Sequence, residues 1–133
     1  MTDAAFLETF EAGALDPGAF HHRDHVRAAW LLLGQAPAAE AMARFTRALR
    51  QFAARAGKPG LYHETVTCAY LLLIHERMAR GPAGGAFAAF AERNGDLLTW
   101  RPSALDRYYR PETLQSDLAR RVFLLPDRLE SPR

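Results

Sequence analysis

The sequence predicts an all-α protein. We expect a single helical domain over residues 1–133, a bundle of four to five helices with short helices and an irregular C-terminal tail. Apolar residues recur every three or four positions in five segments, breaks rich in proline and glycine separate those segments, and no run alternates like a strand. The 133 residues are 49% hydrophobic and 24% charged, which suffices for a core without a disulfide or a structural metal.

The first two predicted helices each carry an apolar stripe and a glycine at the end. The first ends at Gly13, and its stripe consists of Phe6, Leu7 and Phe10. Leu15-Asp16-Pro17-Gly18 then predicts a turn. The second helix covers about 22–33, and we expect Gly34 to end it.

The next three predicted helices are separated by two glycine-proline breaks. The third covers about 37–56 and begins at Pro37, which suits the first turn of a helix. The fourth covers about 62–80 and the fifth about 86–93. The buried stripe of the third helix is expected to be Met42, Phe45, Leu49 and Phe52.

The last quarter of the chain is divided by prolines into short pieces. Ser103 and Ser116 are typical caps for helices of one to three turns. From Leu124 onward we expect a tail that lies over the surface.

Charge and composition exclude several classes of protein. The net charge is +2 and the pI about 9.0, but no segment clusters five or six basic residues, so we expect no nucleic-acid partner. No apolar run approaches the ~20 residues of a membrane span, so we expect no membrane partner. Abundant arginine and alanine favour a GC-rich bacterium as the source of the sequence. The start of the chain lacks the features of a secretion signal, so we expect the protein in the bacterial cytoplasm. A homo-oligomer stays open.

Three of the five histidines fall within five positions at one predicted helix start, at positions 21, 22 and 25. Residues three apart share a helix face, with Cβ atoms about 5–6 Å apart. His22 and His25 can therefore converge on one ion or one substrate atom. His21 and His25, four residues apart, could also converge on one ion. We favour His22 and His25 because we expect Phe20, at the preceding turn, to face the core. The alternative is capping or core hydrogen bonding.

A second helix start carries His63 and Glu64. Catalytic zinc commonly takes three protein ligands, and non-haem iron takes two histidines and a carboxylate. His63 or Glu64 is the natural third ligand if the two helix starts face each other. His75 follows 12 residues later on the same helix, about 18 Å farther along its axis, so we place it outside the site.

Asp24 and Glu64 are the candidate acids of this site. Either can serve as a fourth metal ligand or as a general base, and Asp24 can instead hold an imidazole N–H in place. The alternative for both is a structural role, because carboxylates in the first turn of a helix are stabilised by its dipole.

The C-terminal quarter interleaves aromatic residues with arginines, and we expect Arg101, Tyr108 and Arg120 to orient a small anionic molecule. The planar guanidinium group matches a carboxylate or phosphate. The alternative is ordinary packing of aromatic rings beside salt-bridged surface arginines.

Three short motifs resemble those of a largely uncharacterised family of small helical bacterial proteins. The patterns are FxHxDH, YHxTxT and SxxAR, and the resemblance covers about residues 6–130. They map onto Phe20, His22, Asp24, His25, Tyr62, His63, Thr65, Thr67, Ser116, Ala119 and Arg120. The resemblance implies no specific activity.

The leading hypothesis is a small helical metalloprotein that acts on a small anionic molecule. His22, His25 and His63 would bind a divalent ion, with Zn, Fe, Mn and Ni not distinguished by the sequence. One alternative is a metal-free enzyme in which a histidine is the general acid–base. Another is a small-molecule binding or interaction module. Whether the chain is an enzyme is left open.

Overall fold

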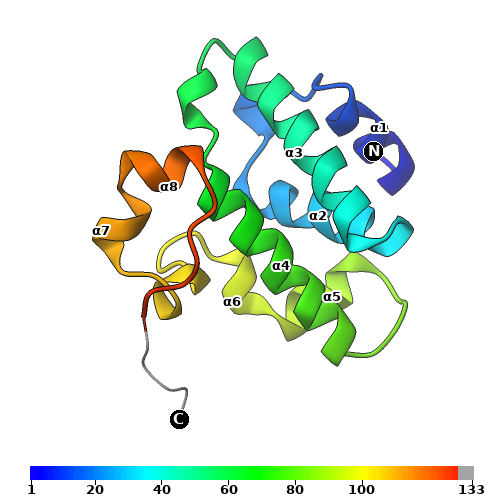
Figure 1. Cartoon of the computed structure of the whole chain (residues 1–133). Coiled ribbons are helices and arrows are strands. Elements are labelled where there is room, and N and C mark those ends of the chain that lie inside the picture. Colours follow the sequence, from blue (N-terminus) through cyan, green and yellow to red (C-terminus); the bar gives the residue numbers. More distant parts are fainter. Residues whose placement is uncertain (129–133) are drawn as a thin grey trace.

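The computed structural model describes residues 1–128, and this part of the chain is all-α, without a strand (Figure 1). The predicted fold class is therefore confirmed. Four helices are nine residues or longer: α1 (Asp3–Glu11), α2 (His22–Gln35), α3 (Ala38–Arg55) and α4 (Glu64–Arg80). None of the helices within residues 1–128 has the length and hydropathy needed to cross a membrane.

The long helices begin and end close to the predicted bounds. Thr2 caps α1 by accepting a hydrogen bond from the N–H of Ala5 at 3.1 Å. The prediction that Gly34 ends the second helix is wrong, because α2 continues to Gln35. A glycine inside a helix costs only about 1 kcal/mol relative to alanine, and the N–H of Ala36 still bonds to the carbonyl of Leu32.

The core lies where α2 crosses α3 and α4. In Figure 1, α1 packs on α3, and the C-terminal quarter lies across α4 on the side away from α1. Phe20 is buried, as predicted. The largest fully buried side chains come from both halves of the chain: Phe10, Val26, Leu32, Thr65, Leu71, Ile74, Leu97, Leu105 and Tyr109.

The fifth predicted helix, about 86–93, corresponds to α5 (Phe87–Arg93). After it the chain forms short helices, as predicted: α6 (Gly95–Leu98), α7 (Pro111–Leu114) and α8 (Asp117–Arg121). Single 3-10 turns also occur at Pro17–Ala19, Pro59–Leu61 and Ala104–Arg107. Ser103 and Ser116 cap their helices, each accepting a backbone N–H at 3.1 Å.

The segment after α8 is fastened to α4 rather than merely laid on the surface. The hydroxyl of Thr65, which is fully buried, donates to the carbonyl of Val122 at 2.7 Å and accepts from the N–H of Leu124 at 3.0 Å. Farther along, the carboxylate of Asp127 accepts from the N–H of Arg110 at 2.9 Å and from the hydroxyl of Thr113. The predicted tail beyond residue 128 lies outside the described residues.

Candidate functional site

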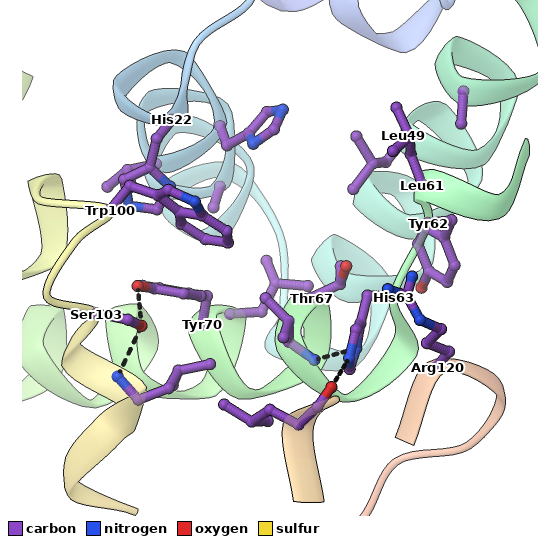
Figure 2. A pocket seen from close by; sticks show the side chains of 18 of the residues that line it. His22, Leu49, Leu61, Tyr62, His63, Thr67, Tyr70, Trp100, Ser103 and Arg120 are labelled. Carbon is purple, nitrogen blue, oxygen red and sulfur yellow. Dashed lines mark hydrogen bonds between the residues drawn. The ribbon is translucent and has the colours of Figure 1, made fainter. Parts of the chain in front are cut away.

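A pocket of about 980 Å³ opens between α2, α3, α4 and the C-terminal quarter (Figure 2). Its volume is that of a small-molecule site. Five of the eight predicted site residues line it: His22, His25, His63, Arg101 and Arg120. Asp24, Glu64 and Tyr108 are not among its lining residues.

His22 is the first residue of α2 and is held by a bond to the end of α6. Its Nε2 lies 2.8 Å from the carbonyl oxygen of Leu97. Because a carbonyl only accepts, Nε2 carries the proton and Nδ1 has the free lone pair. Burial lowers the pKa of His22 below its ordinary 6.5, partly opposed by the bond to Leu97. His22 is therefore a neutral imidazole at neutral pH.

His25 lies one turn farther along α2 and lines the same pocket, as its spacing from His22 predicts. Its ring meets the ring of Phe20 edge-on, with centroids 4.1 Å apart. Burial above all, together with the neighbouring His22, lowers the pKa of His25 from 6.5 to about 4, against the opposing effect of Asp24. Within residues 1–128 the ring nitrogens of His25 make no hydrogen bond, so they are available to a ligand.

His63 has a structural role in this fold. It caps α4, with its Nδ1 accepting the N–H of Val66 at 3.1 Å. Its Nε2 donates to the carbonyl of Leu114 at 2.7 Å, which ties the start of α4 to the end of α7 (Figure 2). Nε2 thus carries a proton and the lone pair of Nδ1 accepts a hydrogen bond, so neither ring nitrogen is free to bind a metal.

The three histidines line one pocket but are not grouped as ligands of one ion within residues 1–128. No group of three or more His, Cys, Asp or Glu side chains within residues 1–128 is placed to hold a metal ion. Figure 2 shows His22 beside Trp100 at one end of the pocket and His63 beside Arg120 at the other. A shared ion would require His63 to give up both of its hydrogen bonds.

The carboxylates of the two candidate acids are engaged in hydrogen bonds with the backbone or with neighbouring side chains. The carboxylate of Asp24 accepts the N–H of His21 at 3.0 Å, which is the structural role at a helix start. Glu64 accepts the hydroxyl of Tyr62 at 2.5 Å and pairs with Arg50 at 3.2 Å. Burial, and then the bond to Glu64, raise the pKa of Tyr62.

Cations outnumber acids along the pocket. Lys58, Arg101 and Arg120 line it and are exposed, whereas Asp106 is the acid that the lining includes. The carboxylate of Asp106 already accepts the N–H of Ser103 at 3.3 Å. Tyr108 lies outside the pocket, where its carbonyl accepts the N–H groups of residues 127 and 128. The electrostatic balance of the pocket favours an anion.

Tyr70 is a lining residue that the sequence did not indicate as a site residue, whereas Thr67, which also lines the pocket, belongs to the YHxTxT motif. The hydroxyl of Tyr70 lies 2.8 Å from the Oγ of Ser103, and its ring meets the ring of His22 edge-on. The periodicity of α4 indicates a packing residue at position 70, and this signal is the same for a core tyrosine and a pocket tyrosine. The partner Ser103 is 33 residues away, beyond the reach of local sequence patterns.

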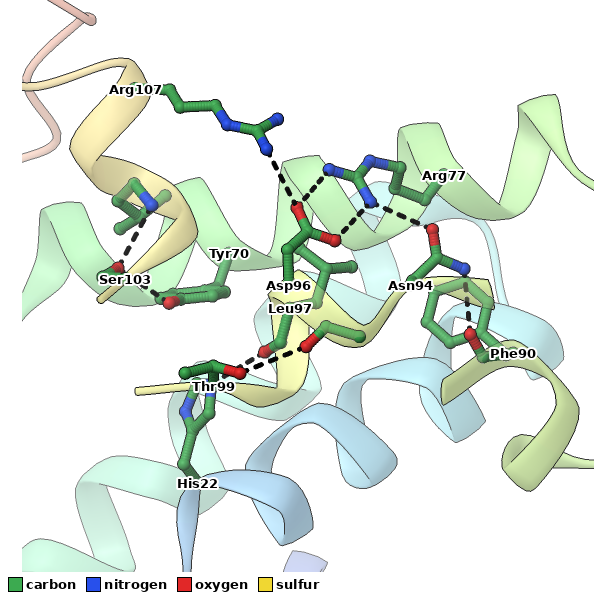
Figure 3. Close-up of polar contacts among 12 residues, drawn as sticks. His22, Tyr70, Arg77, Phe90, Asn94, Asp96, Leu97, Thr99, Ser103 and Arg107 are labelled. Carbon is green, nitrogen blue, oxygen red and sulfur yellow. Dashed lines mark hydrogen bonds and ion pairs between the residues drawn. The ribbon is translucent and has the colours of Figure 1, made fainter. Parts of the chain in front are cut away.

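A polar cluster behind the pocket holds α6 against α4 (Figure 3). The guanidinium of Arg77 donates to both carboxylate oxygens of Asp96, at 3.0 and 2.7 Å, and to the side-chain oxygen of Asn94 at 3.0 Å. The bond with Arg77 is the main reason why the pKa of Asp96 is lowered. Since Leu97 directly follows Asp96, this ion pair fixes the carbonyl that orients His22.

Comparison with known proteins gives no information on the family or the function of this chain. No family model, no curated protein and no solved structure matches this chain.

Proposed function

We propose that the chain binds a small organic anion in the pocket between α2 and α4, without a metal. The observation that carries this proposal is the convergence of His22, His25, Arg101 and Arg120 on one pocket. Guanidinium groups supply charge-assisted hydrogen bonds to a carboxylate or phosphate. The inner wall is apolar, which suits the body of an organic molecule.

His22 and His25 give this pocket two neutral imidazoles on one helix face. A neutral imidazole can accept a hydrogen bond from a ligand or take up a proton from it. If the chain is an enzyme, these two residues are therefore our candidates for the general base. A cytoplasmic location and the oligomeric state remain predictions from the sequence.

The experiment is an NMR titration with a panel of carboxylates, phosphate monoesters and sulfonates. The chain has two tryptophans, and only Trp100 lines this pocket, while Trp30 lines a smaller one elsewhere. We expect at least one class of anion to shift the indole N–H signal of Trp100 saturably and leave that of Trp30 in place. A panel in which no anion shifts the Trp100 signal at millimolar concentration would refute the proposal.

Divalent metal binding by His22, His25 and His63 is the competing proposal, supported by their common pocket. It is the weaker one because His63 uses both ring nitrogens in the fold. Calorimetric titration of untagged, metal-free protein with ZnCl₂, MnCl₂, NiCl₂ and anaerobic FeCl₂ separates the two. One equivalent bound with micromolar affinity, and lost in both His22→Ala and His25→Ala, would favour the metal.

A further inference from the structure

The two ends of the pocket differ in charge. At one end, the Nη1 of Arg120 donates to the carbonyl of Gly60 at 3.2 Å, so α8 touches the loop that carries Lys58. This bond uses one of the five N–H donors of the guanidinium group. Within residues 1–128 Lys58 makes no ion pair. Two cations with free donors therefore stand at this end.

The opposite end is aromatic, and its two charged lining residues, Arg101 and Asp106, are opposite in sign. Trp100 is 49% exposed, and its ring packs on those of His22 and Tyr70, with centroids 5.1 and 6.4 Å away. In Figure 2 the indole stands at the edge of the pocket, across from Leu61 and Tyr62. An aromatic ring held by its neighbours, with half of its surface open, is a ready stacking surface for an apolar or aromatic group.

Apolar side chains connect the two ends. Leu49 and Phe52 of α3 and Val66 of α4 line the pocket, which reaches core residues such as Leu71 and Ile74. Where a polar body, such as a sugar, faced Leu49, Phe52 and Val66, its hydroxyl groups would be unpaired, at a cost for each group. A hydrocarbon body would instead bury its surface here.

From this polarity, and building on the proposed function, we infer that the ligand is an amphipathic carboxylate. Its carboxylate binds Arg120 and Lys58, and its apolar or aromatic body runs along the inner wall to Trp100. A carboxylate matches one guanidinium fork and one ammonium. A phosphate site usually adds free N–H groups at a helix start, but the Val66 N–H at the start of α4 is already taken by His63.

The test uses 4-phenylbutyrate as the probe. Two compounds with the same phenylbutyl group but a different polar group, 4-phenylbutan-1-ol and 4-phenylbutyl phosphate, are compared with it. Affinities come from the shift of the Trp100 indole N–H signal, and the Trp30 signal is the internal control. We expect the carboxylate to bind at least about tenfold more tightly than the alcohol. A hydrogen bond to a charged group contributes more free energy than a neutral one, and the difference corresponds to about tenfold in affinity.

The variants are Arg120→Gln and, as matched control, Arg121→Gln. Arg121 is the next residue of α8, pairs with Asp117 at 2.8 Å and does not line the pocket. We expect Arg120→Gln to reduce the affinity for the carboxylate about tenfold and to leave that for the alcohol unchanged, and Arg121→Gln to change neither. An unchanged affinity for the alcohol also shows that the variant pocket is folded.

Several results would overturn this inference. They are equal binding of alcohol and acid, tighter binding of the phosphate than of the carboxylate, equal losses in the two arginine variants, or no response to any of the three probes. If the probes fail but another anion of the panel shifts the Trp100 signal, the inference fails and the proposed function stands. If no anion shifts that signal, both fail.

Discussion

At the scale of single residues, the side chain of His63 connects two helices through hydrogen bonds. It caps α4 through Nδ1 and holds α7 through Nε2. We expect His63→Ala to lower the free energy of unfolding by about 2 kcal/mol, because a lost cap and a lost hydrogen bond each cost about 1 kcal/mol.

Urea unfolding measures this effect, and His75→Ala is the control. His75 lies on the same helix and is exposed, so its replacement should change the unfolding free energy by less than about 0.5 kcal/mol. A His63→Ala protein as stable as the control would show that the two bonds do not contribute.

His25 should make the stability depend on pH. Its pKa is lowered from 6.5 to about 4 in the folded chain, so between these values the unfolded chain binds more protons than the folded one. Stability must therefore fall as the pH falls through this window. From pH 7 to pH 5, we expect a loss of about 2 kcal/mol from His25 alone.

The measurement is urea unfolding at pH 7 and pH 5 for the wild type, His25→Gln and His75→Gln. His22, whose pKa is also lowered, adds a loss of the same sign in all three proteins. His25→Gln should lose about 2 kcal/mol less than the other two. Equal losses in all three would mean that His25 is accessible to protons in the folded state.

The sequence could predict which residues share a helix face but not how their polar atoms are used. The spacing of His22 and His25 placed both on the pocket side of α2, which the structure confirms. For His63, the deciding atom is the carbonyl of Leu114, 51 residues away. Local periodicity carries no information on such a contact, so a helix cap and a metal ligand looked alike.

At the scale of elements, Thr65 fastens the C-terminal segment to α4. Its buried hydroxyl is both donor and acceptor for the backbone of Val122 and Leu124. Thr65→Val keeps the shape of the side chain but leaves two backbone groups unpaired, each at a cost of about 1–3 kcal/mol. We expect a loss of stability of about 2–3 kcal/mol and faster proteolytic cleavage after Arg121.

Thr46→Val is the matched control for this prediction. Within residues 1–128 the hydroxyl of Thr46 bonds only to the carbonyl of Ala43 in its own helix, at 3.2 Å. Limited trypsin digestion followed by mass spectrometry reports cleavage after Arg121. If Thr65→Val is cleaved there no faster than Thr46→Val, the segment is held by other contacts.

The helix pattern was the most predictable feature at this scale. Caps such as Ser103 and Ser116 act within three residues, so the sequence identifies them directly. The end of α2 was misplaced at Gly34 because glycine weakens a helix without forbidding it. The attachment of the C-terminal segment to Thr65 spans more than 50 residues and could not be read from a local pattern.

At the scale of the whole molecule, the pocket exists because distant parts of the chain meet. One wall comes from α2, α3 and α4, and the other from residues 100–120. The sequence predicted two groups of site residues, one around the histidines and one in the C-terminal quarter, but not their meeting. Hydrogen bonds between Tyr70 and Ser103 and between His63 and Leu114 join the two walls. The bond between His22 and Leu97, 75 residues apart, holds α2 against α6 beside the pocket.

This long-range link leads to our last prediction, which concerns Asp96. Its carboxylate makes two hydrogen bonds with Arg77 and lies 4.0 Å from Arg107, and the next residue orients His22. Asp96→Asn keeps the size of the side chain but replaces the ion pair with a hydrogen bond from Arg77 to a neutral amide oxygen. We expect a loss of stability of about 1–2 kcal/mol. Because Leu97 then holds His22 less firmly, and the ring of His22 packs on Trp100, we also expect a shift of the Trp100 indole N–H signal.

Asp117→Asn provides the comparison, because Asp117 forms an exposed pair with Arg121 within one helix. Such pairs contribute about 0.5 kcal/mol or less, and this one lies outside the pocket. Urea unfolding and the NMR signal of Trp100 distinguish the two variants. If Asp96→Asn destabilises the chain but leaves the Trp100 signal unchanged, then the ion pair supports the fold without shaping the pocket, and His22 is positioned by α2 alone.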